Sequence, residues 1–254
     1  MGSHYENIGF VVTDFAGMAE VGDQVLAHGV KISGPQIDYY CLDAGGGAEL
    51  WLAIGAGMVF EGMTPAYRGE SRIPVHITAY LPEEEYFGEG KLHCWVNPSD
   101  DAATGEYPML CDVVEYAGIR ARLHVPARAT LQLSAFAHSV RCYPDDAQYY
   151  QFQEDNDGAP LAVETFMPIG LFLKTDEDGT VQKPRPMAII TGHVLSASRV
   201  INTITQQPFY ALTVQTAGAV IDVVGDLEHF PIAPEPGWVV QGEYWLSGRI
   251  IDNG

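Results

Sequence analysis

The sequence predicts a mostly β (α+β) protein, with multi-stranded sheets, one clear N-terminal helix and a small barrel at the C-terminal end. Short apolar runs bounded by turn residues recur along most of the chain, as strands require. The 27 glycines and 16 prolines are scattered between these runs, which is typical of strands joined by turns. Hydrophobic residues fill 47% of the 254 positions and charged residues 18%, so the chain can fold around a core.

The first 60 residues predict a βαβββ module. Asp14 can cap a helix in which Phe15, Met18 and Val25 recur near helical spacing, and Gly29 stands where a left-handed residue would end it. The strands of this module that can be placed are expected at residues 8–12, 37–42 and 48–54.

Two further regions follow, a β-rich central region at 61–183 that packs with the module and a small barrel at 184–254. A proline-flanked break at residues 183–186 separates them. In the central region, strands are expected at 73–81, 91–96, 109–116, 119–125, 130–143 and 161–172, a short helix or aromatic loop at 144–152, and a hairpin turn at 175–179. In the last region, strands are expected at 188–195, 209–215, 219–224 and 238–251.

The charge of the chain argues against several partners. It has 33 acidic and 13 basic side chains, for a net charge of −20. Nucleic acids and anionic membrane surfaces are bound mainly through clustered Lys and Arg, and the basic residues here form no stripe. No apolar stretch is long enough to span a membrane and no secretory signal precedes the module. The four cysteines are widely spaced, so we expect reduced thiols and a cytoplasmic protein.

The N-terminal module resembles half of a vicinal oxygen chelate (glyoxalase-like) fold. Residues 7–14, the capped helix and residues 47–52 carry the resemblance. It implies a divalent metal bound by a His on the first strand and a Glu on the fourth, and Glu49 matches that Glu. Asn7 stands at the position of the His, and His76 in residues 74–80 matches the second His. Glu49 and His76 are therefore the candidate metal ligands.

Each candidate ligand also has a purely structural interpretation. Glu49 would point outward from a strand beside buried Leu50 and Leu52, because successive strand side chains alternate between faces. His76 would be a half-buried strand histidine.

The last 70 residues resemble a five-stranded barrel of the oligonucleotide/oligosaccharide-binding (OB) type. Glycines punctuate its expected strands, and Trp238, Tyr244 and Trp245 lie on the last one. Barrels of this type bind single strands in basic, aromatic grooves. Only Arg199 and Arg249 are basic from Met187 onward, against six acidic residues, so this region does not favour nucleic acid.

No catalytic motif is present in the sequence, neither a nucleophile elbow, a phosphate loop, a zinc-protease helix nor a dinucleotide fingerprint. No catalytic residues or cofactor are therefore predicted. The leading hypothesis is a non-catalytic binding or assembly protein that engages another protein, a second copy of itself or a small neutral ligand. One alternative is a metal-dependent enzyme, or a degenerate relative of one, using Glu49 and His76. The other is an acidic decoy or immunity-type protein that binds a basic partner.

Overall fold

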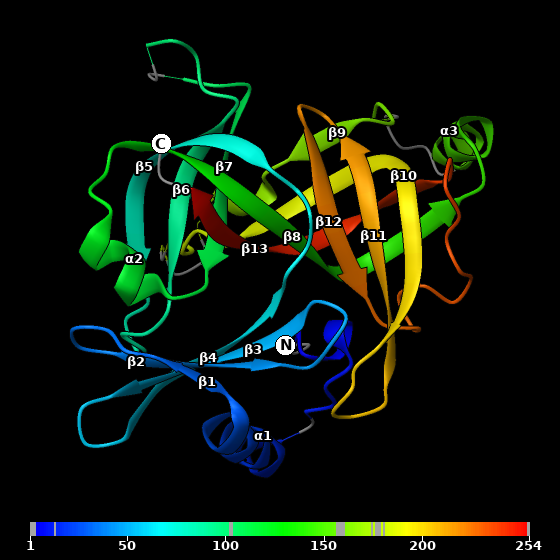
Figure 1. The fold of residues 1–254 in the computed structure, drawn as a ribbon. Helices are drawn as coiled ribbons and strands as arrows, with labels where there is room; N and C mark the ends of the chain where they lie inside the picture. Colours follow the sequence, from blue (N-terminus) through cyan, green and yellow to red (C-terminus); the bar gives the residue numbers. More distant parts are fainter. Residues whose placement is uncertain are drawn as a thin grey trace.

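A computed structural model describes residues 4–12, 14–101, 104–155, 161–173, 175, 179 and 181–252. The prediction of a mostly β protein is confirmed, and Figure 1 shows the arrangement. The helices are α1 (Phe15–His28), α2 (Tyr116–Arg122) and α3 (Asp146–Asp155), with short 3-10 helices at Glu6–Ile8 and Ile169–Leu171. The strands are β1 (Val30–Ile32), β2 (Asp38–Asp43), β3 (Ala48–Gly55), β4 (Val59–Tyr67), β5 (Ile73–Pro82), β6 (Gly90–Val96), β7 (Tyr107–Val113), β8 (Ala127–Tyr143), β9 (Thr165–Met167), β10 (Met187–Ile201), β11 (Pro208–Thr216), β12 (Ala219–Gly225) and β13 (Val239–Asp252).

The strands form two sheets. The first is antiparallel, with the order β1-β2-β3-β4, and the second is mixed, with the order β11-β12-β8-β5-β6-β7-β13-β10-β9. The second sheet also contains the pairings β8–β13 and β10–β11. These extra pairings close it into two rings of strands.

The two rings share the long strands β8 and β13. One ring runs β5-β6-β7-β13-β8 and the other β10-β11-β12-β8-β13, and each contains one parallel pairing, β7–β13 or β12–β8. The strands expected at 184–254 therefore close only with the help of β8, which comes from the central region. Strands from both sides of residue 183 belong to one hydrogen-bonded unit.

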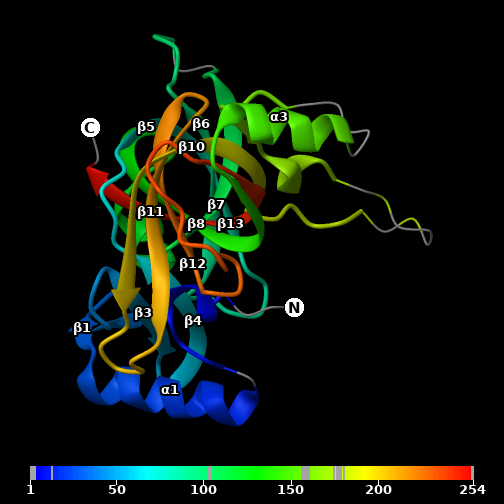
Figure 2. The same cartoon turned by 90° about the vertical axis from the view of Figure 1, so that its right-hand side faces the viewer.

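The four-stranded sheet lies between α1 and the two rings, as both views show (Figures 1 and 2). β3 is consequently covered on both faces. Leu50 and Leu52 pack in a cluster with Val25 of α1, whereas Trp51 packs in a cluster with Val114, which follows β7. No helix in the described part of the chain is long and apolar enough to cross a membrane.

Helix α1 agrees with the prediction in its extent. The Asp14 side chain accepts a hydrogen bond from the backbone N–H of Gly17 at 2.8 Å, which caps the first turn. The end differs in detail, because Gly29 has extended backbone angles and not left-handed ones. The helix predicted as one alternative for residues 144–152 is present as α3.

Three predicted strands are wrong or much reduced. Ile8 ends a 3-10 helix and no strand follows it at residues 9–12, because Gly9 at φ +80° turns the chain out of the extended conformation; Ile8, Phe10 and Val12 are buried and Val11 is exposed. Residues 119–125 overlap α2, in which Tyr116 and Ile119 place two buried side chains on one helical face. The segment 161–172 contains only the three residues of β9 and a 3-10 turn. The predicted turn at 175–179 lies mostly outside the described residues.

Candidate functional site

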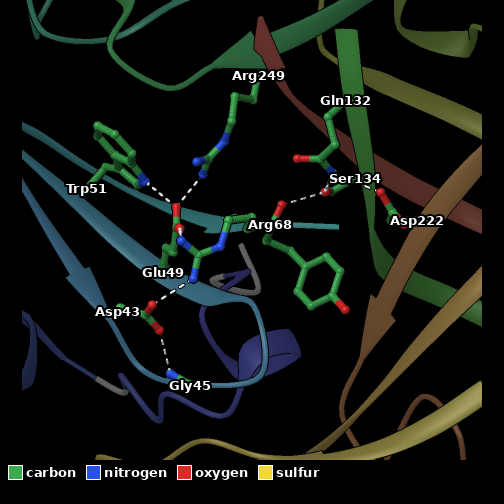
Figure 3. Close-up of polar contacts among 10 residues, drawn as sticks. Asp43, Gly45, Glu49, Trp51, Arg68, Gln132, Ser134, Asp222 and Arg249 are labelled. Carbon is green, nitrogen blue, oxygen red and sulfur yellow. Dashed lines mark hydrogen bonds and ion pairs between the residues drawn. The ribbon is translucent and has the colours of Figure 1, made fainter. Parts of the chain in front are cut away.

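Glu49 does not point outward to solvent; its residue surface is 1% exposed, because the face of β3 that it occupies is covered. Figure 3 shows three side chains that converge on its carboxylate. The indole Nε1 of Trp51 donates a hydrogen bond at 2.9 Å, and the guanidinium of Arg249 forms a close ion pair with the same oxygen, Oε2. The guanidinium of Arg68 lies 3.4 Å from Oε1. Both carboxylate oxygens therefore already have cationic partners.

The surroundings of Glu49 connect the small sheet to the end of β13. Arg68 also pairs with Asp43 at 2.6 Å, and the pKa of Asp43 is lowered, first by the hydrogen bond from the Gly45 backbone and then by Arg68. The guanidinium of Arg249 lies 5.4 Å from the centre of the Trp51 ring, within cation–π range. This arrangement is that of a buried ion-pair network holding two sheets together.

His76 lies on β5, in the other sheet from Glu49. It is half-buried, and its Nδ1 atom is buried without a hydrogen-bond partner. Among the described residues, no group of three or more His, Cys, Asp or Glu side chains could hold a metal ion. Asn7, at the position of the absent His, instead donates a hydrogen bond to the backbone oxygen of Ala137 at 2.9 Å. Glu49 and His76 therefore lie in different sheets, and the described residues provide no third ligand for a metal site that would use them.

A second site combines a cavity with two carboxyl groups. The cavity has a volume of about 200 Å³ and lies where the four-stranded sheet meets the shared strands β8 and β13. Its walls come from the N-terminal segment, β4, the residue before β6, and strands β7, β8 and β13. The lining residues are His4, Tyr5, Met63, Thr64, Pro65, Glu89, Asp112, Phe136, Trp245 and Ser247.

Asp112 is positioned by three neighbouring strands. It lies on β7, opposite Lys91 on β6 and beside Ser247 on β13. The indole Nε1 of Trp245 donates a hydrogen bond of 2.6 Å to its carboxylate. Burial raises the pKa of Asp112 to about 6, although the Lys91 charge and the Trp245 hydrogen bond both favour the ionised form. Lys91 also forms an ion pair with Glu83, so its positive charge is shared between Glu83 and Asp112.

Glu89 immediately precedes β6 and reaches across to β4. The Thr64 hydroxyl donates a hydrogen bond of 3.3 Å to its Oε1. Gly62 gives the carboxylate its space, because a Cβ on this residue would lie 2.5 Å from Oε1 of Glu89. Burial, and then the negative charge of Asp112, raise the pKa of Glu89 to about 7. Glu89 and Asp112 thus form an electrostatically coupled pair of carboxyl groups.

Aromatic side chains and the N-terminal segment form much of the remaining wall. The ring of His4 lies 4.8 Å from that of Trp245 and 6.4 Å from that of Phe136. Burial lowers the pKa of His4 to about 4, so it is neutral near pH 7. The hydroxyl of Tyr5 donates to the Met63 carbonyl at 2.5 Å, which fixes the segment against β4.

Sequence reasoning missed this site because its parts are far apart in the chain. Glu89 follows an acidic run that is typical of a solvated surface, and Asp112 lies in an apolar strand. The signal that could have drawn attention to Asp112 is a single carboxyl group between buried Cys111 and Val113. Comparison with known proteins adds nothing to the assignment, since no family model and no curated protein matches the chain.

Proposed function

We propose that the protein binds a small molecule in the cavity between the four-stranded sheet and strands β8 and β13. The observation that carries this proposal is the cavity itself, which combines aromatic walls with the two carboxyl groups of Glu89 and Asp112. Ligand sites in proteins are typically concave, mostly apolar and equipped with a few convergent polar groups, and they often lie where two structural units meet. Raised pKa values of grouped carboxyls are also more common at functional sites than elsewhere.

The volume supports a ligand of modest size. A dry cavity of about 150 Å³ accommodates benzene, and this one is about 200 Å³. The ligand we propose therefore has a ring or short branched chain of about that size, with a few additional atoms to reach the carboxyl groups. This proposal makes the binding hypothesis from the sequence more specific. The residues expected to contact the ligand are Glu89 and Asp112, and no longer Glu49.

The indole N–H of Trp245 is the reporter for a test, because it donates directly to Asp112 in the cavity wall. Benzyl alcohol and benzylamine are titrated separately into ¹⁵N-labelled protein, and the Trp245→Phe variant assigns the indole resonance. We expect at least one of these compounds to shift that resonance in a saturable manner.

Two serine variants test whether the compounds bind in the cavity, one inside it and one outside it as the control. Ser247 lines the cavity and is 5% exposed, so Ser247→Leu should fill the space and abolish the shift. Ser139 on β8 is exposed and lies outside the cavity, so Ser139→Leu should leave the shift intact. If neither compound moves the Trp245 resonance of the unmodified protein, the proposed binding function is wrong.

We also propose that each ring of strands is of the OB type. The support is the order β10-β11-β12-β8-β13, in which the third and fourth members, β12 and β8, pair in parallel and the remaining neighbours are antiparallel. The ring β5-β6-β7-β13-β8 repeats this order. In this interpretation, the sequence-based OB resemblance extends to both rings, and β8 and β13 serve each of them.

A further inference from the structure

The charges around the cavity do not balance. Glu89 and Asp112 are both in its wall, and the cationic side chain nearest in register is Lys91, which is already paired with Glu83. His4 is the remaining basic side chain of the lining, and it is neutral near pH 7 because burial lowers its pKa. A ligand in this space therefore meets an excess of negative charge.

The uncharged part of the wall also favours a cation. Trp245, Phe136 and Tyr5 contribute three aromatic rings to the lining. The faces of aromatic rings attract ammonium groups, with Trp the strongest of the three residue types. Aromatic rings next to carboxylates are a combination that suits an ammonium head, which has several hydrogen-bond donors and no acceptor.

We propose that the ligand of this cavity is a small organic monocation, a protonated amine carried on an apolar group of about the size of benzene. This inference rests on the proposed binding function and specifies its ligand. An anion would be repelled by both carboxylates, and a neutral molecule would leave their charges uncompensated. A metal ion lacks support, since the described residues provide no cluster of three ligating side chains.

A cation would also change the protonation of the site. Its charge favours the ionised carboxylates, so binding should release protons from Glu89, whose pKa in the empty protein is about 7. The other charged and titratable groups facing Glu89 are Asp112, His4, Tyr5 and Tyr39. Of these, Asp112 changes charge near pH 6, and His4 and the two tyrosines keep their neutral forms between pH 6 and 8.

The experiment compares two compounds of nearly equal shape, benzylamine, which is protonated at neutral pH, and benzyl alcohol. Isothermal titration calorimetry is performed on the complete chain at pH 6 and pH 8. At pH 8 we expect the amine to bind at least about tenfold more tightly than the alcohol, a factor that corresponds to 1.4 kcal/mol. The affinity of the amine should fall between pH 8 and pH 6, whereas that of the alcohol should stay constant or rise. Titrations at pH 7 in two buffers of different ionisation enthalpy should reveal proton release with the amine alone.

Carboxamide variants identify the charges responsible. Glu89→Gln and Asp112→Asn keep the side-chain shape, and each should weaken amine binding about tenfold while changing alcohol binding less than about threefold. Glu154→Gln is the matched control, since Glu154 is an exposed carboxylate on α3 outside the cavity lining. It should leave both affinities unchanged.

The outcomes separate this inference from the binding function. Equal binding of the two compounds, or tighter binding of the alcohol at pH 8, overturns the cation proposal and leaves the binding function in place. Binding of neither compound, with an unmoved Trp245 resonance, overturns both. The comparison of the two compounds on the unmodified protein decides the matter even if a carboxamide variant does not fold.

Discussion

Substitution of Glu49 by Gln tests whether this residue is the structural centre of the ion-pair network between the two sheets. The variant keeps the size of the side chain and removes its charge, while Arg249 and Arg68 stay in place. Glu49 has a side chain that is 2% exposed, and the side chain of Arg249 is 21% exposed. The substitution therefore leaves the Arg249 guanidinium largely buried beside a neutral amide.

The expected loss follows from this burial. Removing one partner of a buried ion pair costs about 3–5 kcal/mol. Arg249 retains some contact with water, so we expect the lower end of that range, about 3 kcal/mol. For a chain of this length each kcal/mol lowers the melting temperature by about 2–4 °C, which gives a decrease of about 6–12 °C. Arg68 is 53% exposed, and Glu49 keeps its ion pair with Arg249 when Arg68 is replaced, so Arg68→Gln should cost no more than about 1 kcal/mol.

The assay is urea denaturation followed by Trp fluorescence and circular dichroism, together with calorimetric melting. A double-mutant cycle adds the single variants Glu49→Met and Arg249→Met and the double variant that combines them. Because the double variant leaves no unpaired charge, it should lose less stability than the sum of the single variants. If Glu49→Gln lies within 1 kcal/mol of the unmodified protein, the network does not stabilise the junction and this reasoning is refuted.

Three further predictions concern other parts of the fold. Burial raises the pKa of Glu89 to about 7, so the folded protein binds protons more strongly than the unfolded chain. The stabilising contribution of this group is therefore present below about pH 4 and is lost as the pH rises through 7. Glu89→Gln should flatten this part of a plot of melting temperature against pH. Asp14→Ala removes the cap of α1 and should cost about 1 kcal/mol in urea denaturation, whereas Asp14→Asn should cost much less. Cys94 and Cys111 are fully buried, so Ellman's reagent should label them only at the rate of unfolding, and labelling within minutes under native conditions would contradict their placement.

Local sequence signals were sufficient for elements whose stability depends on neighbouring residues. Asp14 and the spacing of the apolar residues after it indicated α1, and the apolar run that includes Leu50 and Leu52 indicated β3. The same reasoning failed at residues 119–125, where Ile119 and alternating arginines mimic the period of a strand. There the burial of Tyr116 and Ile119 in one core selected a helix.

The candidate ligands show the corresponding limit for the site. The family resemblance indicated Glu49 as a candidate metal ligand, but its surroundings depend on Arg249, which is 200 positions later in the chain and reaches it only in the folded protein. The same holds for Glu89 and Asp112, whose neighbours in the cavity come from β4, β8 and β13. No local pattern records such contacts, because they join strands that are distant along the chain.

The sequence by itself determined the mostly β character, the capped N-terminal helix and the acidic charge, since these follow from composition, spacing and local hydrogen bonds. Tertiary structure decided that β8 and β13 would be shared by two rings, that the face carrying Glu49 would be covered, and that a cavity would form at the junction of the sheets. The physical reason is that strand pairing and burial depend on contacts between distant residues, so a carboxyl group that looks solvated in the sequence can be enclosed among aromatic rings once the sheets pack.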